Sequence, residues 1–262
     1  MPRLIPFRSA VVCALALMLS LSITAGAVAK GVSADLRVVG KGGKVLTEQT
    51  LSTGTTAIKT SPQANCFGAG TAGSGKSVTV KGATALGLLS QASKSTSSLR
   101  PLLITDAFDF GLGICGIGTS KVSGKASWYL KVNHKGATVA GDAVKLKPGD
   151  EVLWSYAPSF PYANELALEA PERVESGVPF AVRAFSYDET GKRKPIAGAK
   201  VSGVSGSALA VTDADGRATV TLTAPGGVPQ YETLQATHGK DIPSPAEPVY
   251  LCVAGSCIQT TK

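Results

Sequence analysis

The sequence predicts a mostly β protein of the α+β class, in which a small mixed sheet with one short helix precedes a β-sandwich. Two observations carry this prediction. The chain of 262 residues contains 30 glycines and 15 prolines, which interrupt it at short intervals. Between them lie short runs that alternate apolar and polar residues, whereas patterns of helical period are rare. Chains of short strands joined by tight turns have this composition and pattern.

Residues 1–29 are predicted to be a secretory signal. Arg3 and Arg8 give a basic start, residues 10–27 carry no charge, and small residues precede a cleavage site after Ala29. The alternative is a membrane anchor, but a spanning helix needs about 20 strongly apolar residues, and serine, threonine and glycine interrupt this run. We therefore expect a protein that is secreted or held in the cell envelope, without a membrane span after cleavage.

The charge of the mature chain argues against a nucleic-acid partner. Removal of the signal takes away two of the 26 basic residues and none of the 18 acidic ones, which leaves a formal charge of +6. These charges are scattered, and the basic run at residues 192–194 follows Asp188-Glu189-Thr190-Gly191, a sequence typical of a loop tip. Nucleic-acid binding usually needs a continuous basic face.

The chain after the signal is predicted to form two domains. Removing 29 of the 262 residues leaves 233, which suffice for two hydrophobic cores. Residues 158–163 are proline-rich, and proline removes the backbone donors that a continuing strand needs. We therefore place a linker at residues 158–163, a first domain at residues 30–157 and a second domain at residues 164–262.

The first domain is predicted to contain one helix, at residues 83–93. Its leucines lie on one face together with Ala85, and Gly82 with Thr84 provides a start. The remainder of this domain is expected to be strand or loop.

An aromatic strand is predicted at residues 128–133. The alternation there places Trp128 and Tyr129 on opposite faces, one of which must be core. We expect Trp128 to pack in the core, with an exposed stacking surface as the alternative. Gly149-Asp150 is predicted to form the turn into a further strand with an aromatic face.

The second domain is predicted to be a sandwich of short strands. Runs bounded by Gly, Pro or Asp are found at residues 166–170, 179–187, 199–201, 208–212 and 218–222. Between the last two, Asp213-Ala214-Asp215-Gly216 is predicted to form a tight turn. A calcium loop is the alternative, but Arg217 follows and the closing acid of such a loop is missing. Residues 196–201 and 212–220 are similar to the Ig-like repeats of bacterial surface proteins.

The four cysteines that remain after loss of Cys13 with the signal are predicted to form disulfides. An even number of cysteines in an exported protein is typical of a disulfide framework. Their distribution favours pairing within domains, and a zinc site is the weaker alternative because no Cys-x-x-Cys occurs and the chain has two histidines. The expected pairs are Cys66 with Cys115 and Cys252 with Cys257.

Motifs for phosphate binding and catalysis are present only in part. Residues 70–77 match the P-loop pattern, but residues 78–82 alternate as a strand where a helix would have to begin, so we expect a loop. Asp106 and Asp109 are candidates for a carboxylate pair of a glycosidase, yet turn formation is the favoured role for both. No Ser or Cys nucleophile occurs in a recognisable catalytic motif. We therefore expect a protein that is not an enzyme.

Three motifs suggest a known family. Residues 82–89, 128–133 and 146–156 resemble, in order and spacing, the transcobalamin-like C-terminal domain family, which includes secreted bacterial proteins. In animal cobalamin carriers this β-domain closes over one face of the corrinoid. The chain departs from the family in its longer turn at residues 133–136, and it has no counterpart of the carriers' large helical domain.

The resemblance and the distribution of aromatic residues give two functional hypotheses. The first is a binding module without catalytic activity, whose ligand is cobalamin, a related corrinoid or another small, flat and hydrophobic molecule. Its candidate site residues are Phe108, Phe110, Trp128, Tyr129 and Asn133. The alternative is a structural or adhesive envelope protein that uses both domains to contact an envelope protein or a glycan.

Overall fold

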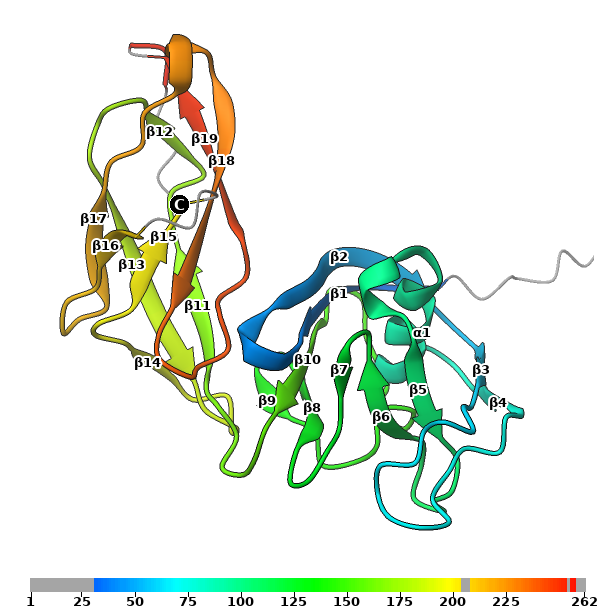
Figure 1. Cartoon of the computed structure of the whole chain (residues 1–262). Coiled ribbons are helices and arrows are strands. Elements are labelled where there is room, and N and C mark those ends of the chain that lie inside the picture. Colours follow the sequence, from blue (N-terminus) through cyan, green and yellow to red (C-terminus); the bar gives the residue numbers. More distant parts are fainter. Residues whose placement is uncertain (1–30, 204–207, 254, 258–262) are drawn as a thin grey trace, which may run out of the picture. The chain divides into compact units, whose positions relative to one another are not determined.

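The predicted fold class is confirmed. The computed structural model describes residues 31–203, 208–253 and 255–257, so the predicted signal and its cleavage site at Ala29 lie outside the described residues. Within those ranges the chain forms many short strands in several sheets, with one α-helix, α1 (Ala85–Ser95) (Figure 1). We refer below to residues 31–157 as the first half and to residues 164–257 as the second half. The assignment of the halves as separate domains stays a prediction.

The first half is organised around one mixed sheet. The chain begins this sheet with an antiparallel pair of strands, and β1 then pairs in parallel with β10, which lies beside β8. Strand order is β2 (Val45–Thr53), β1 (Val32–Val39), β10 (Glu151–Ala157), β8 (Ser127–Val132) and β9 (Lys135–Gly136). The alternation of side chains in β1, β8 and β10 gives this sheet two different faces.

The helix α1 covers the core face of the sheet. It begins two residues later than predicted, because Thr84 is the N-cap and its hydroxyl accepts a hydrogen bond of 3.0 Å from the Gly87 amide. Its leucines are fully buried and pack with Leu36 of β1 and Trp154 of β10. On the opposite face of the sheet, Leu153 packs against Ile242 of the second half, so both faces are covered.

Short strands and turns complete the first half. They are β3 (Thr56–Lys59) with β4 (Ser77–Val80), then β5 (Leu102–Thr105) with β6 (Gly113–Ile117) and β7 (Ser120–Lys121), and the 3-10 turns Lys41–Gly43 and Ser97–Leu99. The P-loop-like residues 70–76 form a loop, as predicted, and strand β4 begins where a phosphate-binding helix would have to begin.

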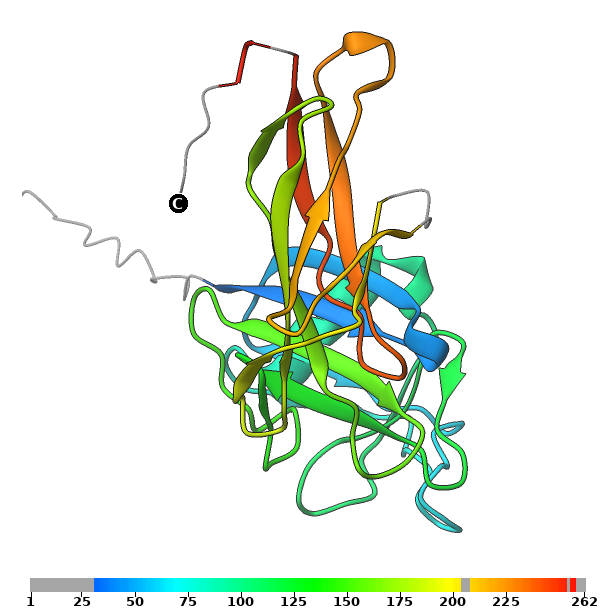
Figure 2. The ribbon, with the colours of Figure 1, turned by 90° about the vertical axis from the view of Figure 1, so that its left-hand side faces the viewer.

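Two sheets form the second half. One contains β11 (Glu165–Glu169), β13 (Phe180–Tyr187), β14 (Arg193–Pro195) and β17 (Arg217–Val220); the other contains β12 (Arg173–Glu175), β19 (Glu247–Cys252), β18 (Gln230–Thr237), β15 (Lys200–Ser202) and β16 (Ala208–Val211). A 3-10 turn, Pro225–Gly227, precedes β18. Figure 2 shows β18 and β19 side by side, in orange and red. Both sheets contribute to one core that includes Leu168, Val182, Val201, Leu234 and Leu251, which is a sandwich arrangement.

The predicted turn between β16 and β17 is present. The Asp213 carboxylate accepts hydrogen bonds from the amides of Asp215 and Arg217, at 2.9 and 2.8 Å. Gly216 has a φ of +73°, and a Cβ there would lie 2.4 Å from the Ala184 carbonyl oxygen. Only glycine fits such a position without displacing the neighbouring strand. The basic run at residues 192–194 is only partly a loop tip, because Arg193 begins β14.

Both disulfides form in the expected pairing. Cys66 bonds Cys115 of β6, and Cys252 at the end of β19 bonds Cys257. These bonds are compatible with an extracellular protein. Among the described residues, no helix is long and apolar enough to cross a membrane.

Candidate functional site

Three phenylalanine side chains form a cluster on the loops of the first half. Phe67 meets Phe108 edge-on, with ring centroids 5.3 Å apart, and Phe108 stacks on Phe110 at 4.9 Å with an interplanar angle of 19°. Phe110 is 75% exposed and Phe67 is 46% exposed. We call these three residues the aromatic platform. The sequence predicted Phe108 and Phe110 as site residues and missed Phe67, although its position next to Cys66 could have indicated it.

The loops that hold the aromatic platform are closely tied together. The disulfide beside Phe67 fixes its loop to β6. A Cβ at Gly113 would lie 3.0 Å from the Phe67 ring and 3.4 Å from the Phe108 ring, so the absence of a side chain there lets both rings lie against β6. At Gly111, where φ is +135°, a Cβ would lie 2.5 Å from Ala140. Glycine at position 113 therefore permits the close approach of the phenyl rings to β6, and glycine at position 111 permits the close approach of two loops.

Asp106 fastens the P-loop-like segment to the loop that carries Phe108. Its carboxylate accepts hydrogen bonds from the amide and the hydroxyl of Ser74, at 2.7 and 2.6 Å. These bonds to Ser74 hold the pKa of Asp106 below its usual value of 3.8. The carboxylate thus stays ionised and acts as a bridge between loops, while Asp109 is exposed nearby.

The other three predicted site residues lie along β8 and its following turn. Trp128 packs against the core and meets Tyr156 edge-on at 5.8 Å, while Tyr129 stacks on Tyr162 at 3.9 Å. Burial raises the pKa of the Tyr129 hydroxyl above 10.0. The Asn133 side chain bonds the Asp150 carboxylate and the Glu151 amide, each at 2.9 Å. The structure therefore brings Phe108 and Phe110 together, whereas the other three side chains contact residues outside the aromatic platform.

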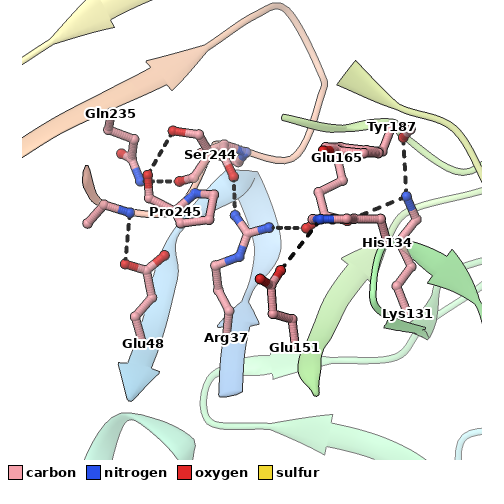
Figure 3. A network of polar contacts seen from close by, with 12 residues as sticks. Arg37, Glu48, Lys131, His134, Glu151, Glu165, Tyr187, Gln235, Ser244 and Pro245 are labelled. Atoms are coloured by element: carbon pink, nitrogen blue, oxygen red, sulfur yellow. Dashed lines mark hydrogen bonds and ion pairs between the residues drawn. The ribbon is translucent and has the colours of Figure 1, made fainter. Parts of the chain in front are cut away.

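A buried polar network occupies the covered face of the sheet beyond the core (Figure 3). Glu165, at the start of β11, accepts a hydrogen bond of 2.5 Å from Arg37 of β1. Lys131 of β8 lies 3.7 Å from the other Glu165 oxygen and donates hydrogen bonds to the carbonyl oxygens of Tyr187 and Asp188. The side chains of Arg37, Lys131 and Glu165 are 8%, 0% and 5% exposed.

His134 extends this network from the turn between β8 and β9. Its ring stacks on Tyr187 at 3.8 Å with an interplanar angle of 8°. Its Nδ1 lies 3.2 Å from Oε2 of Glu165, but neither atom has a hydrogen-bond partner of good geometry. Its Nε2 lies 3.5 Å from a Glu151 oxygen. The ring thus stands between a buried carboxylate and an exposed one.

The pKa values within this network show which contacts dominate. Burial by itself raises the pKa of Glu165, but His134, Arg37 and Lys131 outweigh burial and hold that pKa below its usual value of 4.5. Burial lowers the pKa of Lys131, against the opposing effects of Glu165 and Asp188. Glu165 is therefore ionised at neutral pH and places one negative charge between the two buried basic side chains.

A cavity of about 400 Å³ opens beside this network. Five of its fourteen lining residues are acidic, and we call it the acidic cleft. Its charged lining residues are Asp35, Glu48, Glu151, Glu165 and Glu247, with Arg37 and His134. Within the part of the chain that the structure describes, no group of three or more His, Cys, Asp or Glu side chains is placed to hold a metal ion.

Sequence reasoning missed the acidic cleft. Its residues come from distant positions in the chain, and each is of a type that is common on protein surfaces. One signal was present: Lys131 stands between the apolar residues Leu130 and Val132 in the middle of a strand. A lysine there is buried whenever both faces of the sheet are covered.

No protein-family model matches the chain, and no curated protein matches it. The resemblance of the first half to transcobalamin-like domains, and of the second half to Ig-like repeats, therefore stays a prediction.

Proposed function

We propose that the protein is an exported binding protein without catalytic activity, whose aromatic platform accepts a flat and largely apolar ligand. The observation that carries this proposal is the exposure of Phe110, which is 75% accessible while stacked on Phe108. Exposed aromatic side chains gathered in one place are typical of binding surfaces. Phenyl rings present flat faces for stacking, and they carry no nucleophile, acid or base.

The rigidity of the surrounding loops supports this proposal. The disulfide at Cys66, the Asp106 bridge to Ser74 and the close packing at Gly113 each restrict the platform before a ligand arrives. A surface that is already ordered loses less conformational entropy on binding, which favours affinity.

A corrinoid is the first ligand to test, because the predicted family suggests it. The oxidised chain from residue 30 to residue 262 would be titrated with cobalamin, cobinamide and a water-soluble porphyrin, with corrinoid or porphyrin absorbance and calorimetric heat as readouts. We expect saturable binding of at least one planar probe. Saturable binding of the porphyrin alone would support the platform as a binding site and exclude a corrinoid as its ligand.

Two substitutions, at phenylalanines of similar exposure, distinguish binding at the aromatic platform from non-specific binding to any exposed aromatic ring. Phe110→Ala removes the outer ring of the platform, and we expect it to weaken binding about tenfold, which is about 1.4 kcal/mol. Phe160→Ala removes a phenylalanine that is 74% exposed but lies outside the platform, and it should leave affinity unchanged. Equal affinity of both variants, or no binding of any planar probe at high micromolar concentration, would refute the proposal.

A second candidate function is attachment to an envelope protein or a glycan through the second half. It rests on an aromatic strip of the β12-β19-β18 sheet, where Tyr231 is 72% exposed and lies 5.0 Å from Tyr250. Arg173 lies over the Tyr250 ring at 5.5 Å. Co-sedimentation with isolated cell walls, lost in Tyr231→Ala and kept in Phe110→Ala, would support this function. Equal sedimentation of both variants would argue against attachment through this strip.

A further inference from the structure

We propose that the buried ion network is an acid-sensitive latch, which holds the two halves of the chain together while Glu165 is charged and releases them when Glu165 is protonated. We use the name ion network for Arg37, Lys131 and His134 of the first half together with Glu165 of the second half. Glu165 lies in β11, so each of its contacts in the network joins one half to the other. No residue of the aromatic platform belongs to the ion network, so the latch does not depend on the proposed function.

The apolar contact between the two halves is small. Each half buries its own core, and neither core includes a residue of the other half. Among the described residues, the buried apolar cluster that joins the halves consists of Val39, Leu153 and Ile242. Two cavities, of about 400 and about 830 Å³, are lined by residues of both halves. Contacts between domains that are neither large nor strongly apolar allow the domains to move relative to each other.

The ion network supplies the stronger part of the contact. Arg37 donates a hydrogen bond of 2.5 Å to Glu165 and another to the carbonyl oxygen of Pro243. Lys131 donates hydrogen bonds of 3.2 and 3.1 Å to two backbone carbonyl oxygens of the second half. The side chains of Arg37, Lys131 and Glu165 are 8% exposed or less. Removal of one charge from such a buried group leaves the others uncompensated, which is strongly unfavourable.

Acid acts on the ion network through Glu165. Burial raises the pKa of this carboxyl, but His134, Arg37 and Lys131 outweigh burial and hold the pKa below its usual value of 4.5. The latch therefore holds above about pH 4.5 and opens as the pH falls through the folded value. Protonation leaves Arg37 and Lys131 buried without their counter-charge. Histidine side chains are positively charged in such acid, so His134 adds to these cations.

The other charged groups around the ion network do not replace Glu165. Asp188 is exposed and favours the charged form of Lys131. Glu151 of β10 is also exposed and faces the far nitrogen of His134 at 3.5 Å. The remaining titratable groups nearby are Tyr187, which stacks on His134, and the cleft acids Asp35, Glu48 and Glu247. Charges in contact with water compensate buried cations weakly, so the response to acid depends on Glu165.

The segment between the halves can act as the hinge. Residues 158–161 are exposed and lie in neither β10 nor β11. A few loop residues of this kind absorb the backbone rotations when domains open. Opening at residues 158–161 would uncover Leu153 and Ile242 and would leave the core of each half intact.

The test follows the oxidised chain, residues 30–262, by small-angle X-ray scattering from pH 7 to pH 3. We expect the radius of gyration to rise reversibly by at least about a tenth, as one compact unit becomes two linked ones. Both tryptophans of the sequence, Trp128 and Trp154, pack in the core of the first half, so their fluorescence should stay unchanged. An unchanged radius at pH 3, or a rise that occurs only together with a red shift of the tryptophan emission, would overturn the proposal.

Two variants of the network have opposite expected results. Glu165→Gln removes the negative charge at every pH, so we expect the expanded radius already at pH 7, with little further change in acid. Arg37→Met with Lys131→Met and Glu165→Met replaces the network by apolar side chains, which often stabilise a buried site as well as the charges do. This triple variant should keep the compact radius down to pH 3. Glu169→Gln breaks an exposed ion pair outside the network and should behave as the wild type.

Circular dichroism at pH 7 shows whether each variant is folded. A compact, folded Glu165→Gln at pH 7 would contradict the proposal. If Glu165→Gln does not fold, the triple variant decides. Expansion of the triple variant in acid to the same extent as the wild type would show that net charge, and not the ion network, opens the chain, which also contradicts the proposal.

Discussion

The aromatic platform and the acidic cleft reach a fixed shape by different means. The platform stands on loops, which a disulfide, two glycines and the Asp106 bridge hold together. The cleft stands on strands β1, β2 and β10, and a buried ion network fixes its inner wall. Covalent and steric constraints order the loops, whereas backbone hydrogen bonds between neighbouring strands order the sheet. The strands also hold charged side chains at defined positions. The platform is thus suited to contact area and the cleft to charge.

The largest expected effect concerns the ion network of the cleft. Glu165→Gln leaves Arg37 and Lys131 as buried cations without their counter-charge, so we expect the free energy of unfolding to fall by about 3–5 kcal/mol. Glu169→Gln breaks the exposed pair with Arg193 and should cost about 0–1 kcal/mol. Urea unfolding of both variants gives these values. Similar losses in the two variants would show that the network adds no more than a surface ion pair.

The platform should depend on its disulfide to a comparable degree. Cys66 and Cys115 are 49 residues apart, whereas Cys252 and Cys257 are 5 apart. Loop-closure entropy then predicts losses of about 4 kcal/mol for Cys66→Ser with Cys115→Ser, and about 2 kcal/mol for Cys252→Ser with Cys257→Ser. The first pair should also weaken binding of planar ligands. Chemical unfolding measures both losses, and a larger loss in the second pair would contradict the entropic account.

Acid should weaken the ion network of the cleft. The pKa of Glu165 in the folded chain lies below its usual 4.5, so its stabilising contribution is complete above about pH 4.5 and is lost as the pH falls through the folded value. Lys131 has a lowered pKa, which makes stability rise again as the pH approaches 10.5. Between pH 3 and 7, the free energy of unfolding should depend more steeply on pH in the wild type than in Glu165→Gln. Equal slopes would show that Glu165 does not contribute to this pH dependence.

How far the sequence predicts each region follows from the range of the interactions. Some features depend on residues only a few positions apart, and local sequence patterns predict these. They are the helix start at Thr84, the turn at Asp213, and the placement of Trp128 and Tyr129 on opposite faces of their strand. The two disulfides followed from an even count of cysteines and their distribution between the predicted domains. Phe108 and Phe110 are two positions apart, so the sequence could place both on one loop as candidate site residues, and their rings stack on each other.

The ion network and the acidic cleft could not be predicted in this way. Arg37 and Glu165 are 128 positions apart, and nothing in their sequence neighbours indicates that either is buried. Their burial follows from the covering of the second face of the sheet, a tertiary fact. Phe67 was missed for a similar reason, because the disulfide brings it to Phe108 from a separate loop.

The smallest expected effect is that of ionic strength on the aromatic platform. Raising potassium chloride from 20 to 200 mM should change the affinity for a planar apolar ligand by less than about twofold, because burial of apolar area carries the binding and screening acts on exposed charges. Calorimetry at both salt concentrations measures this change. A tenfold loss would show that charge, and not the phenyl rings, carries the binding.

The most direct test of the account is titration of one planar probe into three proteins: the wild type, Phe110→Ala and Glu151→Gln. The account predicts that Phe110→Ala weakens binding of the probe about tenfold, and that Glu151→Gln leaves it unchanged because Glu151 lies outside the aromatic platform. If Phe110→Ala left affinity for the planar probe unchanged, the aromatic platform would not be the binding site.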